Sequence, residues 1–170
     1  MNHKFAVAVI IAGLCVAVTP PSFAAEKENP ATLAKALTTA SVPLDQGFKV
    51  SEGEGKPISG KFEMEHGALQ LSVYTTKGDK FSEVIVDHVS GSIKKAEVIT
   101  DASDLKHAKE QSKAMAKAKL SLEDGVQSAV KANSGFSAVS ATAVLKSGHP
   151  VAEVTLMKDA KVKKVTEKLD

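Results

Sequence analysis

Cysteine, arginine and tryptophan are almost absent from this chain, and each absence excludes a kind of chemistry. The one cysteine, Cys15, lies in an N-terminal apolar run, so the rest of the chain has no thiol for a disulfide, a nucleophile or a soft metal ligand. Arg and Trp are missing, and Tyr74 is the single tyrosine. Nucleic-acid binding usually requires a basic excess with bidentate Arg and stacking aromatics, so we expect no nucleic-acid partner.

The N-terminus has the pattern of an export signal. Lys4 precedes an apolar run over residues 5–18, and small residues stand at the two positions that a signal peptidase reads, the second being Ala24. We therefore predict a signal peptide over residues 1–24 and a periplasmic or secreted protein. The run is shorter than the roughly 20 residues that span a bilayer, and Leu14 stands before Cys15 where lipoprotein processing needs a small residue. We expect no stable membrane anchor.

Charge is nearly balanced beyond the predicted signal peptide. Loss of Lys4 leaves 21 lysines against 20 acidic residues, a net charge of +1. Lysine and acidic residues are evenly mixed along the chain, which is typical of a solvated surface.

An internal repeat is the most informative feature of the sequence. Leu44-Asp45-Gln46-Gly47-Phe48 aligns with Leu122-Glu123-Asp124-Gly125-Val126 at a spacing of 78 residues, and the spacing then becomes 81. Identical residues at the second spacing are Ser59 and Ser140, Gly67 and Gly148, Val73 and Val154, Lys77 and Lys158, Lys80 and Lys161, and Val84 and Val165. The same order of predicted elements surrounds these matches, which supports a duplication.

Each copy begins with a predicted helix. Ser41 and Ser121 are the expected N-caps, because a serine hydroxyl accepts a hydrogen bond from a first-turn amide. Gly47 and Gly125 stand inside these helices at a cost of about 1 kcal/mol each against Ala. A small residue at the same place in both copies predicts a close approach of helix to sheet.

Three strands are predicted after each helix, because apolar and polar residues alternate with a period of two. The expected strands cover residues 58–65, 69–73 and 81–86 in the first copy, and 139–145, 151–156 and 161–167 in the second. One apolar face per strand predicts an α+β fold in which each helix covers one side of a three- to four-stranded antiparallel sheet.

The predicted organisation has five parts. Residues 1–24 are the signal peptide, residues 25–40 a short N-terminal helix opened by Asn29-Pro30, and residues 41–96 the first module. Residues 97–119 contain a polar linker helix, either a connector or an amphipathic cover, and residues 120–170 form the second module.

Two motifs resemble the PepSY domain. They are Val86-Asp87-His88-Val89-Ser90-Gly91-Ser92-Ile93, whose Asp-x-x-Ser-Gly turn follows a last strand, and the first strand Lys56-Pro57-Ile58-Ser59-Gly60-Lys61-Phe62-Glu63. In the second copy Asp170 stands where this turn would begin, so the copy departs from the pattern. The resemblance implies tandem PepSY-like modules outside the cytoplasm, without catalytic residues, in a family linked to propeptides and inhibitors of secreted peptidases. From the residues alone, we expect Asp87 to bond backbone amides and Gly91 to adopt a positive φ.

No reactive centre is recognisable, so we expect that the protein is not an enzyme. There is no Gly-x-Ser-x-Gly elbow, P-loop or His-Glu-x-x-His motif, and the scattered histidines support a tetrahedral zinc site poorly.

Binding of a hard cation such as calcium or a lanthanide is the preferred interpretation, because such ions take six or more oxygen ligands. Glu63 and Glu65 point the same way on the first predicted strand, and Glu83 and Asp87 join them if the third strand faces that side. An EF-hand is absent, since Ser112 stands where its final Glu would be. The candidate ligands are Glu63, Glu65, Glu83, Asp87, Glu52, Glu54, Asp101 and Asp104.

Recognition of another protein is the alternative. An open antiparallel sheet has edge strands that can pair with an added peptide strand. The family resemblance makes a secreted peptidase the expected partner, with the chain as its inhibitor or modulator.

Overall fold

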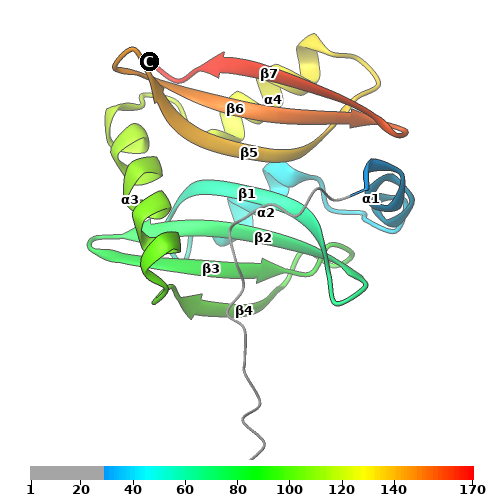
Figure 1. The fold of residues 1–170 in the computed structure, drawn as a ribbon, viewed down its shortest axis with the longest axis horizontal. Coiled ribbons are helices and arrows are strands. Elements are labelled where there is room, and N and C mark those ends of the chain that lie inside the picture. Colours follow the sequence, from blue (N-terminus) through cyan, green and yellow to red (C-terminus); the bar gives the residue numbers. More distant parts are fainter. Residues whose placement is uncertain (1–28) are drawn as a thin grey trace, which may run out of the picture.

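Four helices and seven strands make up residues 29–170, the part of the chain that the computed structural model describes; the predicted signal peptide and Cys15 lie outside it. The fold is α+β, as predicted (Figure 1). In chain order the elements are α1 (Pro30–Leu37), α2 (Leu44–Ser51), β1 (Lys56–Glu65), β2 (Ala68–Lys77), β3 (Lys80–Val86), β4 (Ile93–Val98), α3 (Ala102–Lys117), α4 (Leu122–Ala132), β5 (Ser137–Lys146), β6 (His149–Lys158) and β7 (Lys161–Lys168).

All seven strands belong to one antiparallel sheet with the order β4-β3-β2-β1-β5-β6-β7. The halves meet where β1 pairs with β5, with Gly60 opposite Ala141. The sequence predicts two small sheets, and the structure joins them edge to edge. The pairing continues the hydrogen-bond ladder across the middle of the molecule and leaves β4 and β7 as the edges.

The helices cover the sheet from both sides (Figure 1). On one face α2 and α4 pack against each other and against the strands of their own halves. On the opposite face α3 lies across β5, β6, β1 and β2. Successive residues of β1 face opposite sides of the sheet. Gly60 contacts Phe48 of α2, whereas the neighbouring Ser59 bonds to Gln111 of α3. We call the face that carries α3 the outer face.

The same order, a helix and then three antiparallel strands, occurs in both halves, and small irregularities recur with it. The register shifts beside Ile58 in β1 and beside Val139 in β5, which lie 81 residues apart. The β1–β2 turn has positive φ at His66 and Gly67, and the β5–β6 turn has it at Ser147 and Gly148, again 81 residues on.

Both helices approach the sheet closely at a glycine, as predicted. A Cβ on Gly47 would lie 2.8 Å from Cδ2 of Leu71, and one on Gly125 would lie 3.0 Å from Cβ of Ala152. Leu71 and Ala152 are themselves 81 residues apart. A methyl group would require the Leu71 side chain to move at Gly47, and a shift of a few tenths of an ångström between α4 and β6 at Gly125.

The two helix starts differ, and the predicted N-cap at Ser41 is wrong. Helix α2 is preceded by Pro43, which has no side-chain acceptor, while the Ser41 amide donates to the carbonyl of His88 at 2.8 Å. Helix α4 begins as predicted at Ser121, which forms a capping box with Asp124.

A pair of tethers fixes the entry to each helix. The amides of Ser41 and Val42 donate to the carbonyl of His88 at 2.8 and 3.0 Å. In the second half the amides of Lys119 and Leu120 donate to the carbonyl of Leu169 at 2.7 and 3.0 Å. Each tether joins the start of a half to the residues just after its third strand.

Candidate functional site

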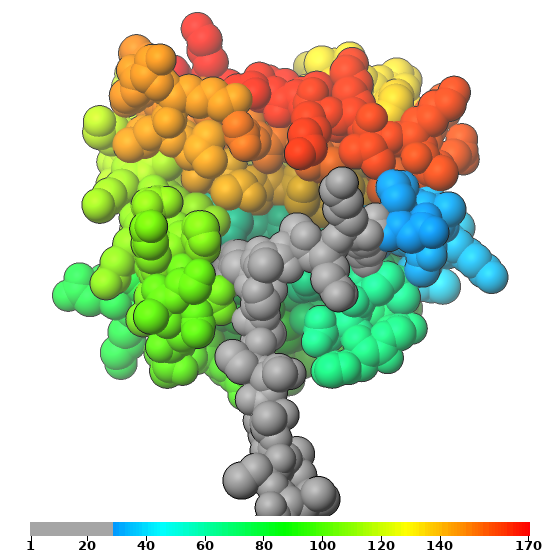
Figure 2. All heavy atoms as spheres, in the orientation of Figure 1, coloured from blue at the N-terminus to red at the C-terminus, as the bar shows by residue number. Residues whose placement is uncertain are grey.

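The outer face carries a row of polar side chains that crosses the whole sheet. Residues that pair directly across antiparallel strands point to the same face, so one row can be followed from edge to edge. From β4 to β7 it consists of Glu97, Glu83, Tyr74, Ser59, Thr142, Glu153 and Thr166. Helix α3 stands on this face in Figure 2 and covers part of the row.

Tyr74 and Glu83 form a hydrogen-bonded pair on this face, and the pKa values of both residues are raised. The Tyr74 hydroxyl donates to the Glu83 carboxylate at 2.9 Å. Burial, followed by the charges of Glu83 and Glu63, holds the pKa of Tyr74 far above its ordinary value. Burial also raises the pKa of Glu83, although hydrogen bonds from Tyr74 and Ser72 oppose the rise. Tyr74 therefore stays protonated in this environment, and the charged form of Glu83 is destabilised.

Ser72 links the second carboxylate to this pair. Its hydroxyl donates to Glu63 at 2.9 Å and also lies within bonding reach of Glu83. Lys61 forms an ion pair with Glu63, and Asp104 of α3 acts on the Tyr74 hydroxyl through its charge. The structure thus gathers Glu63, Glu83 and Asp104, three of the eight predicted ligands, around Tyr74.

The other five predicted ligands lie elsewhere. Glu65 pairs with the exposed His66 at 3.2 Å, and Asp101 caps α3 by accepting from the amides of Ser103 and Asp104. Glu52 and Glu54 are exposed at the C-terminal end of α2. Within residues 29–170, no group of three or more His, Cys, Asp or Glu side chains has an arrangement that could hold a metal ion.

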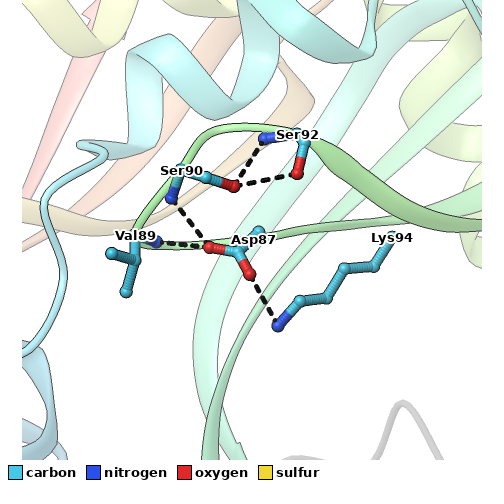
Figure 3. A network of polar contacts seen from close by, with 5 residues as sticks. All are labelled: Asp87, Val89, Ser90, Ser92 and Lys94. Atoms are coloured by element: carbon cyan, nitrogen blue, oxygen red, sulfur yellow. Dashed lines mark hydrogen bonds and ion pairs between the residues drawn. The ribbon is translucent and has the colours of Figure 1, made fainter.

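Asp87, the fifth of these, belongs to the turn between β3 and β4 (Figure 3). Its carboxylate accepts from the amides of Val89 and Ser90 at 2.8 Å each and pairs with Lys94 at 2.9 Å. Lys94 and the two amides hold the pKa of Asp87 well below its usual range. Gly91 has φ of +77°, so both predicted features of this turn are confirmed. Asp87 therefore serves the turn and does not lie beside Glu83.

Sequence reasoning missed the polar contact that holds α3 to the outer face. The Ser59 hydroxyl donates to Oε1 of Gln111 at 2.8 Å, and both residues are buried. The signal was present: Asp104 and Gln111 are seven residues apart, and so share one face of the linker helix. The sequence leaves open whether this helix is a connector or an amphipathic cover, and the structure shows that it covers the sheet through this polar face.

The two edge strands of the sheet differ in how well they are protected against pairing with another strand. All six residues of β4 are exposed. Its apolar residues Ile93 and Val98 are 39% and 59% exposed, and Val89 in the preceding turn is 56% exposed. Strand β7 carries lysine at half of its eight positions, namely Lys161, Lys163, Lys164 and Lys168. Lysine on an edge strand opposes pairing with another strand, so β4 is the more available edge.

Comparisons with known proteins reveal no family. A scan against protein-family models finds no match, and a search of curated proteins finds none. Among solved structures, one match is a protein of Clostridium difficile 630 assigned provisionally to the lipoproteins, with 10% identity and a TM-score of 0.45 over 77% of this chain and 88% of that one. Within the described residues, no helix has the length and apolar character needed to cross a membrane.

Proposed function

We propose that this chain is an exported, periplasmic or secreted binding protein without a reactive centre, built from two PepSY-like modules, and that it recognises another polypeptide by strand addition at β4. The repeated helix-and-strand order, the matching register shifts and the matching tethers support the two modules. The proposed mode of binding is based on the exposed edge of β4.

Strand β4 offers a partner both backbone and side-chain contacts. It pairs with β3 on one side, and among the described strands none pairs with its other side. An added strand would gain a ladder of main-chain hydrogen bonds, while Ile93 and Val98 would lose exposed apolar surface. Lys94 and Lys95 are salt-bridged within the molecule, to Asp87 and Glu97, so their charges oppose pairing less than free lysines would.

A secreted peptidase is the proposed partner. Peptide recognition by strand pairing relies on an extended backbone, and β4 presents such a backbone on a rigid sheet. A peptidase that holds its substrates as extended strands could accept β4 in the same way. The resemblance to a family linked to peptidase inhibition agrees with this proposal.

Charge substitutions on β4 test the proposal. We expect the mature protein to slow cleavage of a fluorogenic peptide by at least one secreted metallopeptidase or serine peptidase. The double substitution Ile93→Lys and Val98→Lys should abolish the effect, because it places two more charges on the edge. Val162→Lys on β7 is the matched control, since Val162 is equally an exposed edge valine, 46% exposed. Slowing that survives the β4 double substitution would contradict strand addition, and no slowing of any peptidase would contradict this partner.

Binding of calcium or a lanthanide is the second candidate, and the closeness of Glu63 and Glu83 at Ser72 favours it. A cation between these carboxylates would remove the cost of burying Glu83 as an anion. A ligand that binds only the folded state raises the melting temperature. We expect calcium or a trivalent lanthanide to do so in the mature protein, with reversal by chelator, and not in the variant carrying Glu63→Gln and Glu83→Gln. An unchanged melting temperature in the mature protein would exclude this site.

A further inference from the structure

Strand β4 ends the sheet on an apolar edge (Figure 1). Ile93, Ala96 and Val98 share one face of the sheet, because their partners in β3 are every second residue of that strand. Two of those partners, Val84 and Val86, are buried in the core, whereas all three β4 residues are exposed. On this side the core therefore ends in apolar surface that a further strand would cover.

The backbone of β4 presents its free hydrogen-bonding groups at defined positions. The amide of Ile99 donates to the carbonyl of Phe81, at the start of β3, at 2.9 Å. Hydrogen-bonded and non-hydrogen-bonded pairs alternate along an antiparallel ladder. Ala96 and Val98, at odd distances from Ile99, therefore direct their amides and carbonyls away from β3. The register with β3 is regular over residues 95–98, so these groups lie along one straight edge.

The charges of β4 are arranged for pairing with a second copy of the same strand. Two antiparallel copies are related by a two-fold axis perpendicular to the sheet, and the central residue then lies opposite its own copy. A centre at Lys95 or at Glu97 would place like charges opposite each other, which is unfavourable. A centre at Ala96 places Lys95 of each copy opposite Glu97 of the other. Opposite charges would thus meet twice, so charge selects the Ala96 register.

The backbone phase favours the same register. With Ala96 at the centre, the outward-directed groups of Ala96 bond to those of its copy, and Lys95 and Glu97 form non-hydrogen-bonded pairs, in which side chains lie closer together. Within one copy Lys95 and Glu97 already form an ion pair at 2.8 Å. Both are more than half exposed, and an exposed pair contributes little to stability, so exchanging it for pairs across the axis costs little.

We propose that in the free protein a second copy closes the β4 edge, in an antiparallel dimer centred on Ala96 whose sheet runs through both copies. This inference rests on the proposed function, because both place strand addition at β4, and it adds a means of regulation. The dimer hides the edge that a peptidase would pair with, and it must dissociate first. A strand of six residues makes a small interface, of the class of weak and transient contacts. We expect the dimer to form at high concentration and to separate on dilution.

A single introduced cysteine tests the register, because the mature protein has no cysteine of its own. In Ala96→Cys the two thiols face each other across the axis at a Cα separation of about 5.5 Å, within the range of a disulfide. Val98→Cys is the matched control on the same face, where the two positions are offset along the strands by about 14 Å. In a glutathione redox buffer we expect a covalent dimer of Ala96→Cys and not of Val98→Cys. Equal yields of covalent dimer would overturn the proposal.

Charge reversal tests the association without a covalent link. Lys95→Glu and Glu97→Lys should each weaken self-association about tenfold, because two pairs of like charge replace two pairs of opposite charge. An equimolar mixture of the two variants should associate with the affinity of the parent, since opposite charges meet again across the axis. Sedimentation velocity between about 1 μM and 1 mM covers the range of weak complexes. A parent that stays monomeric, or a mixture that associates no better than its components, would overturn the proposal.

The disulfide-linked dimer separates this inference from the proposed function. It should not slow a peptidase that reduced Ala96→Cys slows, because its β4 edge is occupied. Slowing by the linked dimer would overturn the proposed regulation. A parent that is monomeric yet slows a peptidase would overturn self-pairing alone. A parent that dimerises through Ala96 but slows no peptidase would support self-pairing and contradict the peptidase as partner.

Discussion

Gly60 lies in β1 directly beneath the ring of Phe48. A Cβ at this position would stand 2.5 Å from Cε1 of Phe48 and 3.2 Å from the carbonyl oxygen of Ser72. The ring is 1% exposed, so neither it nor the strand backbone can move aside at low cost. The absence of a side chain at Gly60 therefore allows α2 to lie close to the sheet.

Gly60→Ala should lower the free energy of unfolding by about 1–3 kcal/mol, the range for overpacking a core. Urea unfolding measures the change. Gly53→Ala is the matched control, because a Cβ there has no atom within 4 Å. We expect this control to be neutral or slightly stabilising. Equal stability of the two variants would show that Phe48 does not pack on Gly60 as described.

Glu83 should make the protein less stable as pH rises. Burial raises the pKa of Glu83 in the folded state above its unfolded value, so the folded protein holds this proton more tightly. Its contribution is complete below the unfolded pKa and is lost as pH rises through the folded pKa. Glu83→Gln keeps an acceptor for Tyr74 and removes the titration. We expect the variant to gain stability relative to the parent between acidic and neutral pH.

The contribution of Asp124 to stability should depend on pH in the opposite direction. Asp124 is therefore a control for the direction predicted for Glu83. The hydroxyl and amide of Ser121 hold its pKa below the ordinary value, so its contribution is lost as pH falls. Thermal unfolding of Glu83→Gln and Asp124→Asn across the acidic range gives both curves. A parent that gains stability relative to Glu83→Gln with rising pH would mean that the fold lowers the pKa of Glu83 rather than raising it, and a difference that does not change with pH would mean that Glu83 is solvated.

At the scale of the element, the two equivalent helices use different starts. Ser121 caps α4, whereas the aligned position before α2 is Pro43, whose fixed φ suits a helix entry but which offers no acceptor. Ser41, the predicted cap, aligns by the 78-residue spacing with Lys119 instead. Ser41 and Ser121 each precede a helix in the sequence, so local sequence alone could not show that only Ser121 is a cap. The role of Ser41 depends on the carbonyl of His88, which is distant in the sequence.

Ser121→Ala should therefore destabilise the protein by about 1 kcal/mol, the typical cost of a lost N-cap. Ser41→Ala should have almost no effect, since Ser41 uses its backbone amide rather than its hydroxyl in the tether. Chemical denaturation of the two variants side by side checks this expectation. A larger loss in Ser41→Ala than in Ser121→Ala would reverse the assignment of the caps.

At the scale of the whole molecule, the sequence predicted the parts better than their assembly. Alternation of apolar residues located three strands in each half but not β4, and the paired glycines located the close contacts of helix and sheet. The β1–β5 seam was not predicted, because the pairing of Gly60 with Ala141 joins residues that are 81 positions apart and carries no local signal. The candidate site was predicted only in part for the same reason, since Tyr74, Ser59 and Gln111 meet through tertiary contacts.

The shared seam should make the two halves unfold together. The ladder continues through it, α2 packs on α4, and α3 contacts strands of both halves. Tyr74 reports on the first half as the single tyrosine, and Phe136→Trp would add a reporter beside β5 in the second. We expect both signals to give one coincident urea transition. Separate midpoints would mean that the seam couples the halves only weakly.

The tethers from Ser41 and Val42 to His88, and from Lys119 and Leu120 to Leu169, also bear on how such a chain can arise. They bring a backbone amide at the start of each half within 3.0 Å of a carbonyl just after the third strand of that half, which in the second half is also near the end of the unit and in the first half precedes only β4. A coding segment for a unit with adjoining termini can be copied in series, or spliced into a surface loop of a host, without straining either fold. The architecture is thus suited to growth by gene duplication, and to circular permutation in the laboratory.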